Sequence, residues 1–274
     1  MKKDDPAEYL RAAGEAGEGP FDIAETALML AALDHPDRSL APYRAHLKEM
    51  AERCNDTIKM LATVEEAAHA ISTLLVGIYG YDGDRMSYDD PLNADLMAVI
   101  DRRRGLPVAL GILYIHAARG AGLRAEGVSS PGHFLLRIAY QGDEMMIDPF
   151  NGGVAVERES LGGPPRLAGA SLDDPRVSTA VNDAEVLLRL ENNVKLRAIN
   201  KGERQRALEV AKRMALIAPR RPDLWLDLAR LNEAVGSLGA ASRSYEACLA
   251  LTGQGTDLHN EAVLSLGSLK RKLN

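Results

Sequence analysis

The hydrophobic pattern of this 274-residue chain changes its period once, and that change limits what the first half can fold into. Residues 107–119 are apolar on nearly every side, which is typical of a buried helix, and Pro107 suits a first helical turn because no N–H is needed there. After the glycines in 120–122 the apolar residues alternate with a period of two, over 133–140 and again over 144–148. The sequence therefore predicts an antiparallel hairpin packed on a central helix.

Capping signals predict three helices in the N-terminal part of the chain. Thr63 and Glu66 have the spacing of a capping box, in which each side chain satisfies a free backbone N–H, and they predict a helix that runs to about Tyr79. Asp22 opens an earlier helix in the same way, and a third helix lies between the two. Cys54 falls on the apolar stripe of this middle helix, so we expect its thiol to be buried.

The C-terminal part of the chain repeats itself with a period of 34 residues. The repeated pairs are Gly202/Gly236, Ala207/Ala241 and Ala211/Tyr245. This period is typical of tetratricopeptide repeats, in which helical hairpins stack in a row. Two hairpins are expected over 188–220 and 222–252, with a helix over 257–273 that closes the exposed end. A plain helical bundle with coincidental spacing is the alternative.

These patterns divide the chain into four parts and indicate an α+β fold followed by an all-α region. The first domain combines a helical N-terminal part with a small antiparallel sheet, and the second is built from tetratricopeptide repeats. The expected parts are a flexible arm over 1–20, the α+β domain over 21–156, a linker over 157–184 and the repeat domain with its capping helix over 185–274.

Composition and charge argue against several classes of partner. The net charge is −6, from 39 acidic and 33 basic residues, so the chain has no global attraction to nucleic acid or to an anionic membrane. The two cysteines lie far apart and the six histidines show no metal-ligand spacing, so we expect no disulfide, metal or cofactor. No apolar leader follows Met1, and the run over 106–118 is shorter than the roughly 20 residues that span a bilayer. A cytoplasmic protein is expected.

A histidine and an aspartate flank the predicted hairpin. A two-residue turn would put His133 and Asp148 on the same face of the sheet, because side chains alternate along a strand. A Gly142-Asp143 turn pairs Asp148 with Arg137, two cross-strand steps from His133, whereas a turn one residue earlier makes His133 and Asp148 diagonal neighbours. A carboxylate that holds an imidazole forms the base and orienting half of a nucleophilic triad.

Four motifs carry a resemblance to a known family. They are Asp101-Arg102-Arg103-Arg104-Gly105-Leu106-Pro107, Gly127-Val128, Pro131-Gly132-His133-Phe134-Leu135 and Ile147-Asp148-Pro149-Phe150-Asn151-Gly152-Gly153. In these motifs the chain resembles the SirB1 family of bacterial proteins, within the transglutaminase-like branch of the papain-type fold, where this domain is commonly joined to tetratricopeptide repeats. The resemblance implies a nucleophilic cysteine at the start of the central helix. Residues 105–113 contain no Cys, Ser or Thr, so this chain lacks a nucleophile there.

Loss of the nucleophile leaves three interpretations of His133 and Asp148. They form a retained hydrogen-bonded core element, or they line an inherited cleft that binds a peptide or a small amide, or His133 activates water as a general base. Cys54 and Cys248 are poor substitutes, because the first lies on a core stripe and the second lies in the repeats. Triad enzymes that lose the nucleophile lose on the order of 10⁶ in turnover.

Two hypotheses about function follow. The first is a non-catalytic transglutaminase-like protein with tetratricopeptide repeats that acts as a protein-binding or regulatory factor. The second is an amide or peptide hydrolase, or an acyl transferase, that uses His133 and Asp148 with a nucleophile not yet placed. A thiol or hydroxyl within hydrogen-bond reach of His133 would favour the second hypothesis. The oligomeric state stays open.

Two regions carry candidate binding residues. Arg102 and Arg103 follow a short helix over 94–101 and suggest an anion site, although ion pairs at the negative end of that helix explain them as well. Asn93 is expected to line the same cleft or to hydrogen-bond within its own loop. The concave face of the repeats offers a groove for a protein or peptide partner, unless its polar residues only support the scaffold. These residues are Asn192, Asn193 and Asn232.

Overall fold

The computed structural model describes residues 5–17, 20–130, 133–156 and 179–273. The chain separates into two compact units. One is Pro20–Leu190, which we call the core unit, and the other combines Met1–Gly19 with Glu191–Asn274, which we call the repeat unit. Most of the linker expected over 157–184 lies outside the described residues.

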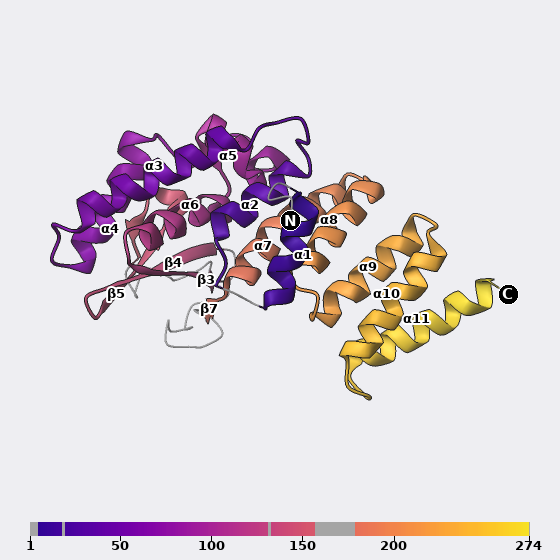
Figure 1. Cartoon of the computed structure of the whole chain (residues 1–274). Coiled ribbons are helices and arrows are strands. Elements are labelled where there is room, and N and C mark those ends of the chain that lie inside the picture. Colours follow the sequence, from indigo (N-terminus) through magenta and orange to yellow (C-terminus); the bar gives the residue numbers. More distant parts are fainter. Residues whose placement is uncertain (1–4, 18–19, 131–132, 157–178, 274) are drawn as a thin grey trace. The chain divides into compact units, whose positions relative to one another are not determined.

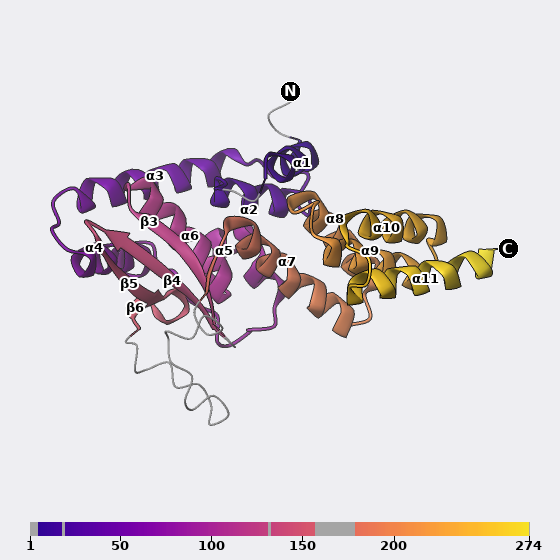
Figure 2. The same cartoon turned by 90° about the horizontal axis from the view of Figure 1, so that it is seen from below.

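The core unit contains a five-stranded antiparallel sheet (Figure 2). Its strands, in spatial order, are β6 (Val154–Ala155), β5 (Asp143–Asp148), β4 (His133–Tyr140), β3 (Arg124–Ser130) and β7 (Thr179–Val181). The predicted hairpin is confirmed as β4 and β5. Strand β7 was not predicted, because three residues at the end of a Gly- and Pro-rich segment show no measurable alternation.

The turn between β4 and β5 settles the register of the hairpin. Tyr140 pairs with Asp143, so Gln141 and Gly142 form the two-residue turn. Both residues have positive φ, 51° and 100°, which is what a type I′ turn requires. This is the earlier of the two turns that the sequence left open.

Helices of the core unit cover one face of the sheet (Figure 1). They are α2 (Ile23–Ala32), α3 (Ala41–Ile58), α4 (Val64–Ser72), the π-helical turn η1 (Thr73–Ile78), α5 (Leu96–Arg102) and α6 (Pro107–Gly120). Helix α6 packs against β3 and β4 on one side and against α2 and α3 on the other. Gly111 permits this approach, since a Cβ there would lie 2.4 Å from Cε1 of Phe134. The predicted central helix is therefore confirmed.

A second, smaller sheet joins two loops of the core unit. Strands β1 (Asp82–Gly83) and β2 (Arg104–Gly105) pair in parallel. The pairing holds the chain that follows Tyr79 against the C-terminal end of α5. Strands of two residues leave no period in the sequence, so this sheet was not predicted.

The predicted capping signals are present in the structure. Thr63 accepts from the backbone N–H of Glu66 at 3.2 Å, and the Glu66 carboxylate accepts from the N–H of Thr63 at 3.2 Å. Asp22 accepts from the N–H of Glu25 at 3.2 Å. The helix that follows Thr63 is α-helical only to Ser72 and continues as η1.

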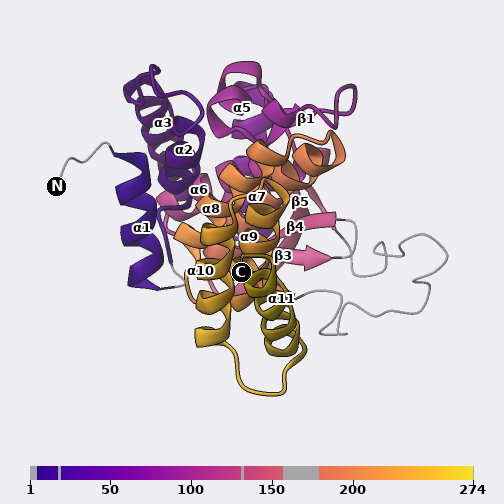
Figure 3. The ribbon, with the colours of Figure 1, turned by 90° about the vertical axis from the view of Figure 1, so that its right-hand side faces the viewer.

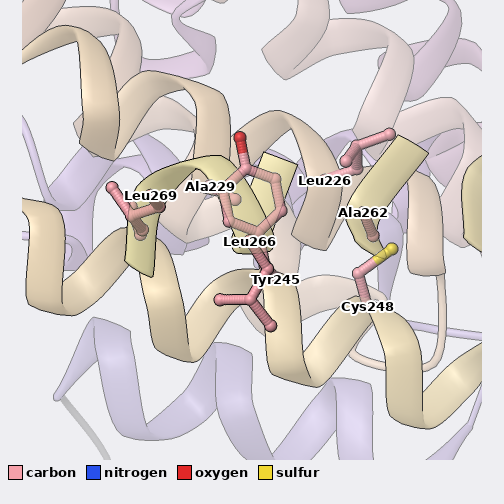
Figure 4. Packing of buried hydrophobic residues seen from close by; sticks show 8 residues of the cluster. Leu226, Ala229, Tyr245, Cys248, Ala262, Leu266 and Leu269 are labelled. Atoms are coloured by element: carbon pink, nitrogen blue, oxygen red, sulfur yellow. The ribbon is translucent and has the colours of Figure 1, made fainter. Parts of the chain in front are cut away.

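The repeat unit is helical (Figure 3). Its helices are the C-terminal part of α7 (Asp183–Asn200), then α8 (Arg204–Ile217), α9 (Pro222–Ala234), α10 (Leu238–Leu251), α11 (Asp257–Leu273) and α1 (Pro6–Ala16). Small residues at the helix contacts, Ala229, Ala241 and Ala262, are fully buried beside Tyr245 and Cys248 (Figure 4). This packing confirms the predicted all-helical repeat region.

Helix α1 lies within the segment that the sequence predicted to be a flexible arm. Asp5 caps it by accepting from the N–H of Ala7 at 3.0 Å. Leu10 is completely buried, and a Cβ on Gly14 would lie 2.0 Å from the carbonyl oxygen of Leu216 in α8. Helix α1 therefore belongs to the repeat unit, although the core unit follows it in the chain.

Candidate functional site

The hairpin register brings the two predicted dyad positions together. When the pairing of Leu136 with Ile147 is continued by one residue, Asp148 faces Leu135, two positions from His133. The backbone therefore makes His133 and Asp148 diagonal neighbours on one sheet face. The side chain of His133 lies outside the described part of the structure.

The Asp148 carboxylate caps the turn that follows its strand. One oxygen accepts from the N–H groups of Phe150 and Asn151 at 2.9 and 3.2 Å. The other oxygen accepts from Nδ2 of Asn151 at 2.7 Å. Asp148 is thus the N-cap of the short 3₁₀-helix η3 (Pro149–Asn151), and both of its oxygens already have donors within that turn.

The start of α6 is where the resemblance implies a nucleophile. Leu106 and Val108 are 1 % and 2 % exposed, and Pro107 separates them. The first hydroxyl along the helix belongs to Tyr114, two turns further on, and burial raises its pKa to about 12. No side chain in the first turn of α6 can attack a carbonyl.

Neither cysteine provides a thiolate. Cys54 is buried in α3, and this burial raises the pKa of its thiol to about 12. Cys248 is buried in α10, and burial raises the pKa of its thiol too. Since the thiolate is the reactive form, both residues act as small apolar side chains near neutral pH.

Asp84, which the sequence analysis did not single out, organises the loop between β1 and α5. Its carboxylate accepts from Oγ and N–H of Ser87 at 2.6 and 2.8 Å, from the N–H of Met86 at 3.1 Å and from Nη2 of Arg102 at 3.2 Å. The hydrogen bonds from Ser87, first from its side chain and then from its backbone, lower the pKa of Asp84 to about 2. The spacing of Asp84 and Ser87 is a local turn signal that could have identified this residue.

Asn93 and Arg102 complete this network. Asn93 is fully buried, and its Nδ2 donates to the backbone carbonyl of Ser87 at 2.6 Å. The backbone carbonyl of Asn93 accepts from the N–H of Leu106 at 2.9 Å. Arg102 pairs with Asp90 at 3.4 Å as well as with Asp84. Both predicted binding residues therefore hold the loop against the start of α6.

The loop exposes apolar side chains next to η3. Met86 is 97 % exposed and Tyr88 is 45 % exposed. The ring of Tyr88 packs edge-on against Phe150, with 5.8 Å between centroids, and the guanidinium of Arg85 lies 4.9 Å above the Phe150 ring. The structure thus places a rigid, partly apolar surface beside the turn that Asp148 caps.

Arg103 belongs to a different cluster from Arg102. Its Nη1 lies 3.0 Å from Nε2 of His46 and donates to the hydroxyl of Tyr81. Its guanidinium also stacks on the Tyr81 ring, 4.8 Å from the centroid. Two consecutive arginines in the sequence therefore serve two separate groups of residues.

The asparagines predicted on the repeats do not share one role. Asn232 is 3 % exposed, and its Nδ2 donates to the carbonyl of Leu228 at 2.9 Å. Asn193 accepts from Nη1 of Arg197 at 3.1 Å, and Asn192 is half-buried on the same helix. Asn232 therefore lies within the packed helices, whereas Asn192 and Asn193 lie nearer the surface.

A row of ion pairs crosses three helices of the repeat unit. Lys195 in α7 pairs with Asp227 in α9 at 2.7 Å, and Asp227 also lies 3.5 Å from Arg230. Arg230 pairs in turn with Glu261 in α11. We call these four residues the ladder; the sequence analysis did not identify it, because its contacts between α7, α9 and α11 form only when the helices stack.

The described residues contain no group of three or more His, Cys, Asp or Glu side chains that would hold a metal ion. Within the same ranges, every helix is too short or too polar to cross a membrane.

Comparison with known proteins identifies two regions. Residues 41–192, more than half of the chain, match the family described as the transglutaminase-like superfamily, and residues 194–260 match a tetratricopeptide repeat. A protein of Xylella fastidiosa named UPF0162 protein is 30 % identical over 210 residues, which is 75 % of each chain. A UPF0162 protein of Pseudomonas aeruginosa is 27 % identical over 201 residues, 73 % of each chain. The mouse F-box only protein 21 is 35 % identical over 82 residues, only 13 % of its length.

Proposed function

The chain belongs to the transglutaminase-like superfamily, among the UPF0162 proteins, and we propose that it is a non-catalytic member that binds another protein. The motifs around His133 and Asp148 further suggest the SirB1 group of that superfamily. The observation that carries the proposal is the start of α6, where Pro107 between the buried Leu106 and Val108 stands in place of a nucleophile. Acyl transfer needs an attacking atom at this point.

The remaining polar groups near that helix support a structural role. Asp148 uses both carboxylate oxygens to cap η3, which supports a role in the turn. In this proposal His133 is a residual member of the dyad. Buried, free cysteines with raised pKa values also agree with a reducing, cytoplasmic location.

The repeat unit supplies the partner surface in this proposal. Tetratricopeptide repeats generally mediate protein–protein interaction. Ile199 lies four residues after Lys195, and Leu264 lies three residues after Glu261, so both share the helix faces that carry the ladder. They are 44 % and 73 % exposed. Asn192 and Asn193 lie on the same helix as Lys195 and are proposed polar contacts at its edge.

Capture from a cell extract of the source organism tests protein binding. The full-length chain should retain a specific partner, and Leu264→Glu or Ile199→Glu should lose it, because each puts a charge into a desolvated contact. Met60→Glu, at a residue that is 86 % exposed on the core unit, is the matched control and should retain the partner. Retention by all variants would contradict the proposed surface.

Catalysis is tested separately with the purified chain. We expect no ammonia release from a glutamine-containing peptide, and iodoacetamide should modify Cys54 only slowly, at the same rate in the His133→Ala variant. Turnover that depends on His133 would contradict the non-catalytic proposal and support the hydrolase or transferase hypothesis.

A further inference from the structure

Arg103 has a backbone conformation that L-residues avoid. It follows the last residue of α5 with φ 59° and ψ 27°, in the left-handed region. Glycine is the usual residue at such a helix end, and a side chain there costs roughly 1–2 kcal/mol. Among the described non-glycine residues only Gln141 also has positive φ, and its hairpin turn requires it. Arg103 therefore occupies a position at which the backbone of a glycine would be less strained.

The partners of the Arg103 guanidinium are neutral. It contacts Nε2 of His46 and the hydroxyl and ring of Tyr81, which is 2 % exposed. Burial lowers the pKa of His46, and the charge of Arg103 lowers it further, so the imidazole is neutral near pH 7. No carboxylate among the described residues forms an ion pair with Arg103, in contrast to Arg102. A half-buried cation without a counter-charge is unusual.

Arg104 adds a second cation at the same end of α5. It is exposed, and its Nη1 donates to the carbonyls of Gly80 and Arg103 at 3.3 and 3.0 Å. Within the described residues it too has no carboxylate partner. These contacts hold the guanidinium over the turn that leads into β1.

The acidic residues around this cluster already have cationic partners. Glu49, whose charge reaches His46, pairs with Arg53 at 2.9 Å. Asp101, whose charge reaches Tyr81, pairs with Arg38 at 3.0 Å. Within the described ranges, the positive charge of Arg103 and Arg104 therefore remains uncompensated.

We propose that Arg103 and Arg104 form a binding site for the carboxylates of an acidic segment in a partner protein. This inference rests on the proposed protein-binding function and adds a second contact to it, on the core unit. Guanidinium groups bind carboxylates through paired, charge-assisted hydrogen bonds, and Arg103 is oriented in advance by Tyr81 and His46. A nucleic acid is disfavoured, because two arginines on a chain of net charge −6 cannot neutralise a phosphate backbone.

The test uses the ¹⁵N-labelled full-length chain and a hexaglutamate peptide as the probe, at low ionic strength. Titration should shift the imidazole signals of His46 in a saturable way, and hexaserine should not. Arg103→Gln should weaken binding about tenfold, since a charge-assisted hydrogen bond is lost. Arg124→Gln removes one charge from a residue that is 71 % exposed on β3, and it should leave the affinity within about twofold.

A third variant separates binding from folding. Arg103→Gly removes the cation and relieves the strained backbone, so it should abolish binding without lowering stability. Equal weakening by Arg103→Gln and Arg124→Gln would reveal only general attraction to a polyanion and would overturn the site. Peptide binding that persists in Arg103→Gly would overturn it too.

The outcome can be distinguished from that of the proposed function. If the wild type captures a partner and Arg103→Gly captures it equally, the acidic-segment site is wrong while protein binding stands. If no partner is captured although the peptide binds as expected, the protein-binding function is contradicted while the carboxylate chemistry of the site holds.

Discussion

Arg102 and Arg103 are consecutive residues at the end of α5, yet they lie in opposite electrostatic settings. Arg102 pairs with Asp84 and Asp90, so its charge is balanced within the loop that it holds. Arg103 contacts only neutral groups, Tyr81 and His46, and its charge is not balanced among the described residues. The difference shows that a basic run need not be one site, because a single left-handed residue can direct adjacent side chains to two separate groups of residues.

The largest change in stability is expected in the network of Asp84 and Arg102, where the charges are balanced. Asp84→Ala removes the acceptor of part-buried hydrogen bonds from Met86, Ser87 and Arg102, and leaves those donors without it. We expect the free energy of unfolding to fall by about 3 kcal/mol, measured by urea denaturation.

Asp56→Ala is the control for this substitution. Asp56 is 79 % exposed and pairs only with Lys59 across a helical turn, so its replacement should change stability by less than about 0.5 kcal/mol. Equal stability of the two variants would mean that the Asp84 network does not hold the loop, and the contrast between the two arginines would disappear.

Lowering the pH should reduce the free energy of unfolding by a smaller amount, because it protonates Asp84 in the loop that Arg102 holds. The pKa of Asp84 is about 2 in the folded chain, against an ordinary value of 3.8. The stabilisation is therefore complete above about pH 4 and is lost as the pH falls towards 2, because the unfolded chain takes up the proton first. Since its partner Arg102 is partly exposed, solvent screens their interaction and we expect a loss of about 1 kcal/mol.

This loss is measured as the difference between the wild type and Asp84→Asn in urea denaturation from pH 5 to pH 2. The difference should shrink as the pH falls, since the amide cannot titrate. A difference that stays constant over that range would show that folding does not lower the pKa of Asp84.

The smallest change in stability is expected at Arg103, whose charge is not balanced among the described residues. Arg103→Gly gives up contacts with Tyr81 and His46, which remain hydrogen-bonded to each other at 2.8 Å, and it relieves the left-handed backbone. Stability should stay unchanged or rise by at most about 1 kcal/mol. Arg102→Gly, the same change one residue earlier, should cost about 2 kcal/mol. Equal losses of stability in the two variants, measured by thermal or urea unfolding, would contradict the distinction between Arg102 and Arg103.

The regular parts of the fold were predictable because their signals are local. The apolar helix α6, the hairpin of β4 and β5, and the capping box at Thr63 each follow from residues that are neighbours in the chain. The hairpin register was left open because Gln141-Gly142 and Gly142-Asp143 are both acceptable turns. The structure adopts the first, and this requires Gln141 to adopt positive φ.

Other features depend on contacts that sequence patterns do not contain. Helix α1 is rich in Ala, Glu and Gly, and only its docking through Leu10 and Gly14 distinguishes it from an arm. In the candidate site, the absence of a nucleophile at the start of α6 was visible in the sequence, but the pairing of Asp84 with Arg102 and the separation of Arg102 from Arg103 were not. They depend on the pairing of β1 with β2 and on one backbone angle.

The position of α1 has a consequence for synthesis on the ribosome. An isolated helix of 11 residues is marginal in water, and the surface that buries Leu10 is made only when α8 is translated, about 200 residues later. At roughly 5–20 residues per second, α1 waits some 10–40 s for its docking surface. Helix α1 thus leaves the ribosome tunnel well before the helix against which it docks, and a folding chaperone would encounter it exposed throughout that interval.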